Sequence, residues 1–504
     1  MKIRILLIYI FISLQTVFAA DSARTLIVFF DGLRPDYITP ALMPNLYRFS
    51  LHASQGLSHH SIYPTVTRVN ATSYSTGCYP MKHGILGNTI YFPELRNQKV
   101  YNTGNVSELT EADSLLSNKM VAAVSIGQIL NSAGKEMRVF SSGSTGQAYL
   151  QDHSRSGWMI NTDLILPATI REKVFQEIGP VPAPQSPKML RHHWITNALI
   201  RFGLSSDGPL VSAIWYSDPD GAAHSNGIGS EPAVKSLKTV DDEFGRILEY
   251  LDKSRMRERF NIIISTDHGF VTHTGKESLT SFLINKGFKK SISSDDVIVA
   301  GGAIYLSKSD SAQVRKIVYE LQRSPSFGAI FTRPRTPHSN EGTIAGTLSY
   351  SSIHWDFETR TPDILVDVNW SDSVNIHGYK GMTSSMGVAG HGSLSPYETN
   401  IRLLVDGPGF KKGKLSKAPT ANIDIAPTIL RLHNVSIPKE MDGRVMNELL
   451  KDQTESENRS EKIEREIIEV NNQLGNKKYT LQLYRLKYKG KIYVDYAQTN
   501  RDGH

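Results

Sequence analysis

Cysteine is almost absent from the chain, since Cys78 is the single cysteine among 504 residues. One thiol cannot form an intrachain disulfide, so the fold has to be stabilised by its core or by bound metal ions. Cys78 could be a nucleophile or a metal ligand, but we expect a small, buried packing residue.

Long apolar runs are also missing beyond the first 20 residues. Those residues combine a basic start at Lys2 and Arg4, an apolar run over residues 5–18 and a small-x-Ala pattern at residues 17–19. This combination predicts a secretory signal peptide over residues 1–20. The apolar run is shorter than the ~20 residues that a membrane-spanning helix needs. We therefore expect a secreted or periplasmic protein without a stable membrane anchor.

A block of basic residues is the third feature that the chain lacks. Its 56 Lys and Arg exceed its 49 Asp and Glu, but the net charge of +7 is spread along the sequence. Nucleic-acid-binding arms concentrate their positive charge. We therefore expect no specific nucleic-acid binding, although a mild positive balance could steer small anionic substrates to the protein.

The chain does contain near-continuous apolar runs that alternate with helical patterns. The runs that read as strands are residues 25–31, 209–220, 260–269, 363–368 and 400–407. Helical spacing occurs at residues 43–54, 121–134, 231–254 and 422–433. Strands rich in Val, Ile and Leu that alternate with helices predict an α/β fold, with a mostly parallel sheet sandwiched between helices.

Two segments depart from this alternation. Residues 269–386 are richer in Ser, Gly and Thr, and we expect them to form a cap subdomain inserted into a catalytic domain over residues 21–448. Residues 449–504 read as a charged linker followed by a β-hairpin. Within them, residues 449–473 are expected to hold a solvated helix, and the hairpin is expected to turn at Lys489 and Gly490.

Three of the apolar strands end in an acidic residue, and histidines lie nearby. The residues concerned are Asp31, Asp220 with His224 four positions later, adjacent Asp267 and His268, and His391 between two glycines. Ligands bind beyond the carboxyl ends of the strands in open α/β sheets. Three Asp and three His match the mixed oxygen and nitrogen ligands of two zinc-like ions, three per ion. Each pair alone would be a helix cap or a structural histidine, but together they predict a two-metal site.

A run of hydroxyl residues follows the first strand and helix, in the segment YPTVTRVNATSYST. Two ions can clamp the attacking and leaving oxygens of a displacement at phosphorus, and such a site needs an oxygen nucleophile. A threonine hydroxyl is inert at neutral pH unless it is activated. Thr67 is the candidate nucleophile, because a helix that starts there would present its N-terminal N–H groups to a phosphoryl group. The other hydroxyls are expected to cap and pack this helix.

The motifs FFDG, YPTVTRVN, TGCYPMKHGILGN, PDGAAH, TDHG and GHG resemble the type I phosphodiesterase/nucleotide pyrophosphatase branch of the alkaline phosphatase superfamily. The resemblance covers about residues 25–433 and implies an alkaline-phosphatase-like core. It implies an exported, two-metal hydrolase of phosphodiester or pyrophosphate bonds that works through a phospho-threonine intermediate. The implied cofactors are two Zn²⁺ ions, with Mn²⁺ as a possible substitute.

The resemblance also implies a role for each site residue. One ion would be bound by Asp31, Thr67, Asp267 and His268, and the other by Asp220, His224 and His391. Asn88 would donate its side-chain amide to a phosphoryl oxygen, together with the Thr67 backbone N–H.

The sequence departs from this family directly after Thr67. Members that act on nucleotides carry an aromatic residue there, whereas this chain has Arg68. Arg68 could bind a phosphate or carboxylate of the substrate, or it could be a surface helix residue. A small phosphoester or phosphonate is therefore the expected substrate. The alternatives are a phosphonate hydrolase of the phosphonoacetate type or a phosphomonoester hydrolase on the same metal site, and an inactive metal-binding scaffold.

Overall fold

The computed structural model describes residues 23–308, 310–452 and 462–502. The predicted signal peptide lies outside the described residues, and so does part of the predicted charged linker. Among the described helices, none combines the length and the apolar character required to cross a membrane.

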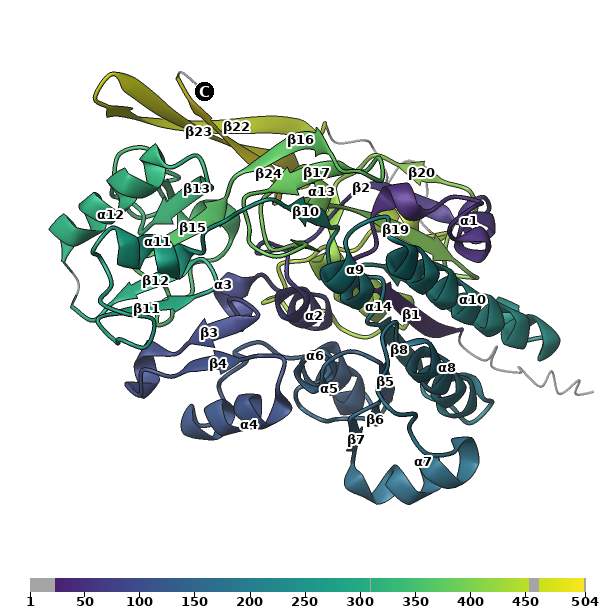
Figure 1. Ribbon diagram of the computed structural model, residues 1–504. Helices are drawn as coiled ribbons and strands as arrows, with labels where there is room; N and C mark the ends of the chain where they lie inside the picture. Colours follow the sequence, from purple (N-terminus) through teal and green to yellow (C-terminus); the bar gives the residue numbers. More distant parts are fainter. Residues whose placement is uncertain (1–22, 309, 453–461, 503–504) are drawn as a thin grey trace, which may run out of the picture.

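A large central sheet organises the fold, and its strand order is β20-β2-β19-β9-β1-β8-β5-β6-β7, with β21 also paired to β2 (Figure 1). The five parallel strands at its middle are β9 (Phe260–Ser265), β1 (Arg24–Phe30), β8 (Val211–Tyr216), β5 (Met137–Ser141) and β6 (Met159–Asn161). Two strands beside them run antiparallel to their neighbours, namely β19 (Asn400–Asp406) against β9 and β2 (Ser54–His60) against β19. The outer strands are β7 (Leu164–Leu166), β20 (Leu415–Ser416) and β21 (Thr420–Ala421). The predicted α/β architecture is confirmed.

Helices cover both faces of this sheet, as alternate residues of β1 show. Ile27 and Phe29 belong to the core on one face, whereas Leu26, Val28 and Phe30 belong to the core on the other. The first face is covered by α2 (Thr67–Thr76), α5 (Ile126–Ser132), α6 (Thr145–Gln151) and α14 (Ile425–Leu432). The second is covered by α1 (Pro44–Ser50), α8 (Met189–Ala198) and α10 (Glu231–Lys253). Burial on both faces explains why the parallel strands read as continuous apolar runs.

A smaller five-stranded sheet lies beside the core, at the left in Figure 1. Its order is β11-β12-β15-β13-β14, and α11 (Leu279–Asn285) and α12 (Ser311–Arg323) pack on it. The strands are β11 (Val297–Ala300), β12 (Ala303–Leu306), β15 (Ile364–Val368), β13 (Phe327–Thr332) and β14 (Leu348–Ser349). We call this sheet and its two helices the side layer. It falls inside the predicted cap, whose boundaries at residues 269 and 386 stay a prediction.

Further strands complete the surroundings of the core. A four-stranded sheet has the order β16-β17-β10-β18. Its strands are β16 (Trp370–Val374), β17 (Lys380–Thr383), β10 (Val271–His273) and β18 (Ala389–Gly390). A two-stranded ribbon joins β3 (Thr89–Tyr91) to β4 (Val100–Asn102). The remaining α-helices are α3 (Pro80–His83), α4 (Val106–Leu115), α7 (Arg171–Ile178), α9 (Asp220–Asn226) and α13 (Pro396–Thr399).

The C-terminal region forms three antiparallel strands, β22 (Glu464–Leu474), β23 (Lys477–Tyr488) and β24 (Lys491–Arg501). The prediction of a solvated helix within residues 449–473 is therefore wrong for residues 464–473, which belong to β22. Ile468, Val470 and Leu474 lie on the more buried side of the strand with period two, while Glu464, Arg465 and Glu469 are exposed, which suits a strand. The sheet joins core and side layer, because Ala497 N–H donates to Leu394 O and Arg501 Nη2 donates to Phe327 O.

Candidate metal centre and nucleophile

The predicted acidic residues meet where three adjacent parallel strands end. Asp31 directly follows β1, Asp220 begins α9 after β8, and Asp267 follows β9. His224 lies one turn after Asp220 on α9, which brings both side chains to the same face of that helix. His391 follows β18, whose residue Gly390 is so close to His224 that a Cβ atom would lie 3.1 Å from its ring.

The first cluster consists of Asp31, Asp267 and His268, whose ligand atoms all lie within 4.8 Å of one another. His268 Nε2 is 3.0 Å from Asp267 Oδ2 and 3.6 Å from Asp31 Oδ1. All three side chains are buried. The other oxygen of each carboxylate is held by a hydrogen bond: Trp215 Nε1 donates to Asp31 Oδ2, and Gly32 N–H donates to Asp267 Oδ1.

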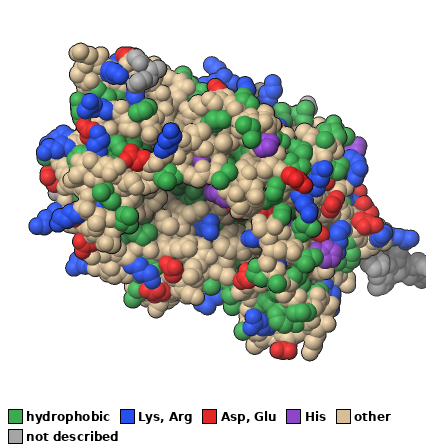
Figure 2. All heavy atoms as spheres, in the orientation of Figure 1, with side chains coloured by type: hydrophobic (Ala, Val, Ile, Leu, Met, Phe, Trp, Pro, Cys, Tyr) green, Lys and Arg blue, Asp and Glu red, His purple; other side chains and the backbone are tan. Residues whose placement is uncertain are grey.

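The second cluster consists of Asp220, His224 and His391, again within 4.8 Å of one another. Asp220 Oδ1 lies 3.2 Å from Nε2 of both histidines. The clusters touch, because the rings of His268 and His391 stack with centroids 3.4 Å apart. Figure 2 shows this face of the molecule hollowed near its centre, with histidine side chains at the hollow.

The orientation of the three histidines shows that the clusters suit cations. Each Nδ1 faces a backbone carbonyl oxygen, which can only accept, so each Nδ1 carries a proton: His224 donates to Ala389 O, His268 to Gly269 O and His391 to Thr65 O. Each Nε2 then directs its lone pair at carboxylate oxygens. Three of those oxygens, each buried, accept no hydrogen bond from the described residues: Asp31 Oδ1, Asp220 Oδ1 and Asp267 Oδ2. The Nε2 atoms and these carboxylate oxygens are all acceptors, so they repel one another when nothing lies between them. A divalent cation between them would remove this repulsion.

The charges of the clusters point the same way. Burial, together with the charges of Asp267 and Asp220, raises the pKa of Asp31 well above its usual value. Burial lowers the pKa of His268, but the charge of Asp267 outweighs it and the net shift is upward. Burial and the neighbouring His268 lower the pKa of His391 to about 4. The carboxylates thus hold more negative charge than the protein neutralises, and protons or metal ions have to balance it.

Thr67 is the first residue of α2 and points at the first cluster. Its Oγ1 lies 3.4 Å from His268 Nε2, and the residue is buried. Asn88 lies beside it, because its Oδ1 accepts the backbone N–H of Arg68 at 3.2 Å. This bond leaves the Asn88 amide nitrogen as a donor on the side away from Arg68 N–H.

Arg68 lies partly buried next to this site. A Cβ atom on Gly104 would lie 2.5 Å from Arg68 Nη2, so the guanidinium packs against the backbone just after β4. Its Nε atom is buried and donates no hydrogen bond within the described structure. Burial lowers the pKa of Arg68, against the charges of the three site carboxylates, which raise it. The surface-residue alternative is therefore disfavoured.

Sequence reasoning missed two residues that hold this arrangement. Trp215 both stacks on Phe29 and donates to Asp31. Glu398 was not considered, although its carboxylate accepts Gly392 N–H, Ser393 N–H and the hydroxyls of Ser393 and Thr65. It thereby joins the loop of His391 to the segment that leads into α2. The only available signal was its position seven residues after His391.

The other polar residues near the site have structural roles. His59, His60 and His83 are buried away from both clusters, and Ser73 Oγ bonds to His83 Nε2. The hydroxyls of Thr72 and Thr76 donate to backbone oxygens of α2, as expected for packing residues. Cys78 is buried, and burial raises the pKa of its thiol to about 11.

The chain is similar to known phosphoryl-ester hydrolases. The family model described as type I phosphodiesterase / nucleotide pyrophosphatase matches residues 25–394. Human bis(5'-adenosyl)-triphosphatase ENPP4 is 24% identical over 445 residues, which cover 85% of this chain and 83% of that protein. Alkaline phosphatase PhoV of Synechococcus elongatus is 25% identical over 262 residues, 47% of this chain and 44% of that protein.

Larger relatives and solved structures match as well. Mouse ectonucleotide pyrophosphatase/phosphodiesterase family member 3 is 26% identical over 247 residues, which cover 47% of this chain but only 24% of that protein. The structure of murine ectonucleotide pyrophosphatase / phosphodiesterase 5 superposes with a TM-score of 0.61 at 17% identity, covering 85% of this chain and all of that chain. An inactive variant of the same murine protein in complex with AMP gives 0.59 at 17% identity, covering 82% and 96%. These structures share the fold.

Proposed function

The chain belongs to the type I phosphodiesterase / nucleotide pyrophosphatase family, and on that premise we propose that it hydrolyses phosphodiester or pyrophosphate bonds with Thr67 as the nucleophile. One observation carries the proposal. A buried threonine hydroxyl at the N-terminus of α2 lies against His268, which belongs to one of two adjoining clusters that each hold three candidate metal-ligating side chains.

The two clusters would hold two divalent cations, Zn²⁺ by the mixture of nitrogen and oxygen donors, with Mn²⁺ as a substitute. Asp31, Thr67, Asp267 and His268 would bind one ion, and Asp220, His224 and His391 the other. When bound, such ions supply Lewis acidity that activates a hydroxyl and a water and neutralises developing negative charge.

The residues of the chain then position the reaction. The Thr67 hydroxyl gives up its proton as its Oγ bonds to phosphorus and the bond from phosphorus to the departing oxygen breaks, and the departing oxygen takes up a proton. Water then adds to phosphorus and breaks the bond to Thr67 Oγ, which regains its proton. The Asn88 amide donates a hydrogen bond to a non-bridging oxygen, and the N–H groups of the first turn of α2 face the same anionic group. Trp215 and Glu398 position the site through their hydrogen bonds to Asp31 and to the loop of His391.

A second candidate function uses the same residues on a phosphomonoester or a phosphonate. Arg68 favours it, because an arginine whose buried Nε has no hydrogen-bond partner among the described residues replaces the aromatic residue that nucleotide-acting members of the family carry at this position. A guanidinium can bind the extra charge of a monoester dianion or a carboxylate bidentately. The similarity to an alkaline phosphatase over 47% of the chain is compatible with this candidate.

Export is part of the proposal and rests on the sequence of residues 1–20 alone. We propose that the mature protein acts outside the cytoplasm, in the periplasm or as a secreted enzyme.

The test compares kcat/KM for bis-p-nitrophenyl phosphate and for p-nitrophenyl phosphate with zinc-loaded protein. A diester preference that Thr67→Ala abolishes supports a phosphodiesterase, and Thr239→Ala on the exposed face of α10 is the matched control. A monoester preference that falls in Arg68→Ala supports the second candidate. Full activity in Thr67→Ala refutes the mechanism.

A further inference from the structure

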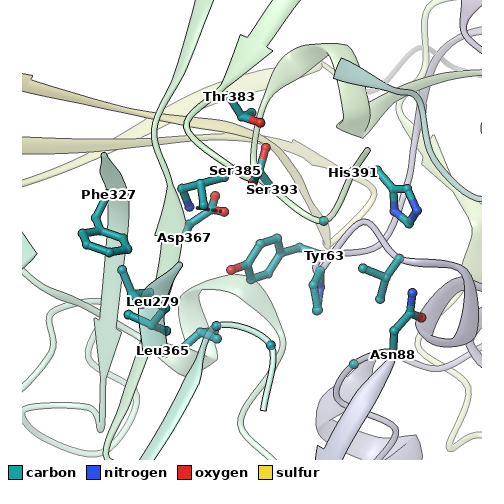
Figure 3. A pocket seen from close by; sticks show the side chains of 18 of the residues that line it. Tyr63, Asn88, Leu279, Phe327, Leu365, Asp367, Thr383, Ser385, His391 and Ser393 are labelled. Atoms are coloured by element: carbon teal, nitrogen blue, oxygen red, sulfur yellow. Dashed lines mark hydrogen bonds between the residues drawn. The ribbon is translucent and has the colours of Figure 1, made fainter. Parts of the chain in front are cut away.

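A pocket adjoins the candidate metal centre and extends to the side layer. It has a volume of about 340 Å³, and Asn88, Val66 and His391 line its end at the metal centre. Leu365 and Asp367 of β15 line the side layer's wall. Figure 3 shows Asp367 and Tyr63 facing this space, with His391 and Asn88 on its other side. The position between two layers, open to the reacting groups, is typical of a substrate site.

The charge of this pocket is one-sided. Its lining includes the carboxylates of Asp367, Glu398 and Glu277, whereas none of the described residues that line it is Lys or Arg. Glu398 is saturated by its hydrogen bonds to the His391 loop, and Glu277 is exposed. Asp367 is only 6 % exposed. It is therefore the buried carboxyl group that faces the pocket without a counter-ion, and burial raises its pKa well above the usual value.

The carboxylate of Asp367 has unused capacity. Its Oδ1 accepts the N–H of Val368 at 2.8 Å and its Oδ2 accepts the N–H of Leu394 at 2.7 Å. Two neutral donors leave about two of its four acceptor positions free. A buried carboxylate that lacks a cationic partner costs folding free energy. A ligand that brings the positive charge would recover that cost on binding.

Two hydroxyls that line the same pocket are also available to a ligand. Thr383 Oγ1 is buried and has no hydrogen-bond partner among the described residues, and the residue is 2 % exposed. No hydrogen bond links the Tyr63 hydroxyl to another described residue, and Figure 3 shows that hydroxyl on the side of the pocket where Asp367 lies. The ring of Tyr63 and the side chains of Phe327 and Trp355 add aromatic lining.

We propose that this pocket binds an ammonium group, carried by one substituent of the phosphoryl group of the substrate, with Asp367 as its counter-ion. The proposal rests on the proposed function, because the phosphoryl group must lie at the metal centre. The lone pairs of the Tyr63 and Thr383 hydroxyls complete the acceptors for the ammonium N–H groups, and the aromatic wall suits the same charge. An anionic substituent would be repelled by Asp367. A neutral one would leave that charge unpaired.

The experiment measures how strongly phosphonates of two kinds inhibit the hydrolysis of bis-p-nitrophenyl phosphate by zinc-loaded protein. Alkylphosphonates are compared with ω-aminoalkylphosphonates of equal heavy-atom count, over chains of three to eight atoms. A hydrogen-bonded charge pair predicts an inhibition constant lower by ~10- to 100-fold for the amine at its best length. Asp367→Asn should remove this difference, and Glu277→Gln, which changes an exposed carboxylate at the same pocket, should keep it.

Tyr63→Phe provides a second variant that preserves the ring and should weaken the preference for the amine. The inference is overturned if amine and alkyl probes inhibit the wild type within about threefold of each other at every length, a difference too small for one charged hydrogen bond. A preference that survives Asp367→Asn overturns it as well. Thermal shifts with the same probes separate the two hypotheses. Amine-dependent stabilisation without hydrolysis would refute only the proposed function, and Thr67-dependent hydrolysis without an amine preference would refute only the pocket.

Discussion

Asn88 tests how the site binds a phosphoryl group. Because Asn88 Oδ1 accepts Arg68 N–H, its amide nitrogen is the atom left to donate to the substrate. Asn88→Ala removes that donor, and loss of one such donor costs roughly 2.7–4 kcal/mol in the transition state, or ~100- to 1,000-fold in rate. Asn88→Asp still accepts Arg68 N–H but sets a carboxylate against the phosphoryl oxygen. Two like charges about 4 Å apart repel by about 4 kcal/mol at an effective dielectric constant of about 20. The aspartate should therefore be the slower variant.

The assay measures kcat and KM separately on bis-p-nitrophenyl phosphate, with the melting temperature as a check that each variant is folded. The expected order of kcat/KM is wild type, then Asn88→Ala, then Asn88→Asp. Asn131→Ala, at an exposed position of α5, should match the wild type. If Asn88→Asp is as fast as Asn88→Ala, the amide does not face the phosphoryl group and the assigned role is wrong.

Two further predictions concern groups around the site and in the core. Glu398→Gln should weaken zinc affinity by ~10- to 100-fold, because one amide oxygen cannot replace a carboxylate that positions the His391 loop. Zinc titration of the purified variant measures this affinity. An affinity equal to that of the control Glu258→Gln, which changes an exposed residue, would contradict the prediction. Burial lowers the pKa of His83 to about 3, and its Nδ1 accepts Ile85 N–H, so protonation would set two donors against each other. Its folded pKa lies below the unfolded value near 6.5, so the stability that it contributes is present above pH 6.5 and is lost as the pH falls towards 3. Urea unfolding should show that His83→Asn loses less stability than the wild type between pH 7 and pH 4, by roughly 1–3 kcal/mol; parallel pH profiles would refute this.

The candidate site was predictable from sequence because its residues mark the ends of continuous strands. The apolar runs of β1, β8 and β9 identify buried parallel strands, and acidic residues at their carboxyl ends have to gather at one edge of the sheet. Asp31, Asp220 and Asp267 follow this rule and meet in the structure. His391 obeys no such rule, since it lies in a loop far along the chain. The motif around it, and not the strand pattern, suggested its place.

The C-terminal strand β22 shows where composition misleads. Residues 464–474 carry enough Glu, Arg and Asn to resemble a solvated segment, and the charges drew attention away from the alternation of Ile468, Val470 and Leu474. A period of two was present, but its apolar residues are sparse. The strand is fixed by its pairing with the neighbouring β23. Such pairing depends on the tertiary structure and cannot be read from the local sequence.

The wall of the pocket shows the same limit more sharply. The run DILVDV, residues 363–368, reads as a buried strand. From the sequence alone, its second aspartate, Asp367, would be interpreted as the end of that strand. In β15, Ile364 and Val366 point into the core of the side layer, whereas Leu365 belongs to the core shared with the central sheet. Side chains alternate with period two, so Asp367 lies on the face of Leu365, towards the core shared with the central sheet. The alternation alone groups Leu365 with Asp367, but only the packing of the two layers shows that this face borders the pocket beside the candidate metal centre. In the proposed ammonium site Asp367 selects the charge of the substrate, because none of the described residues that line the pocket is Lys or Arg.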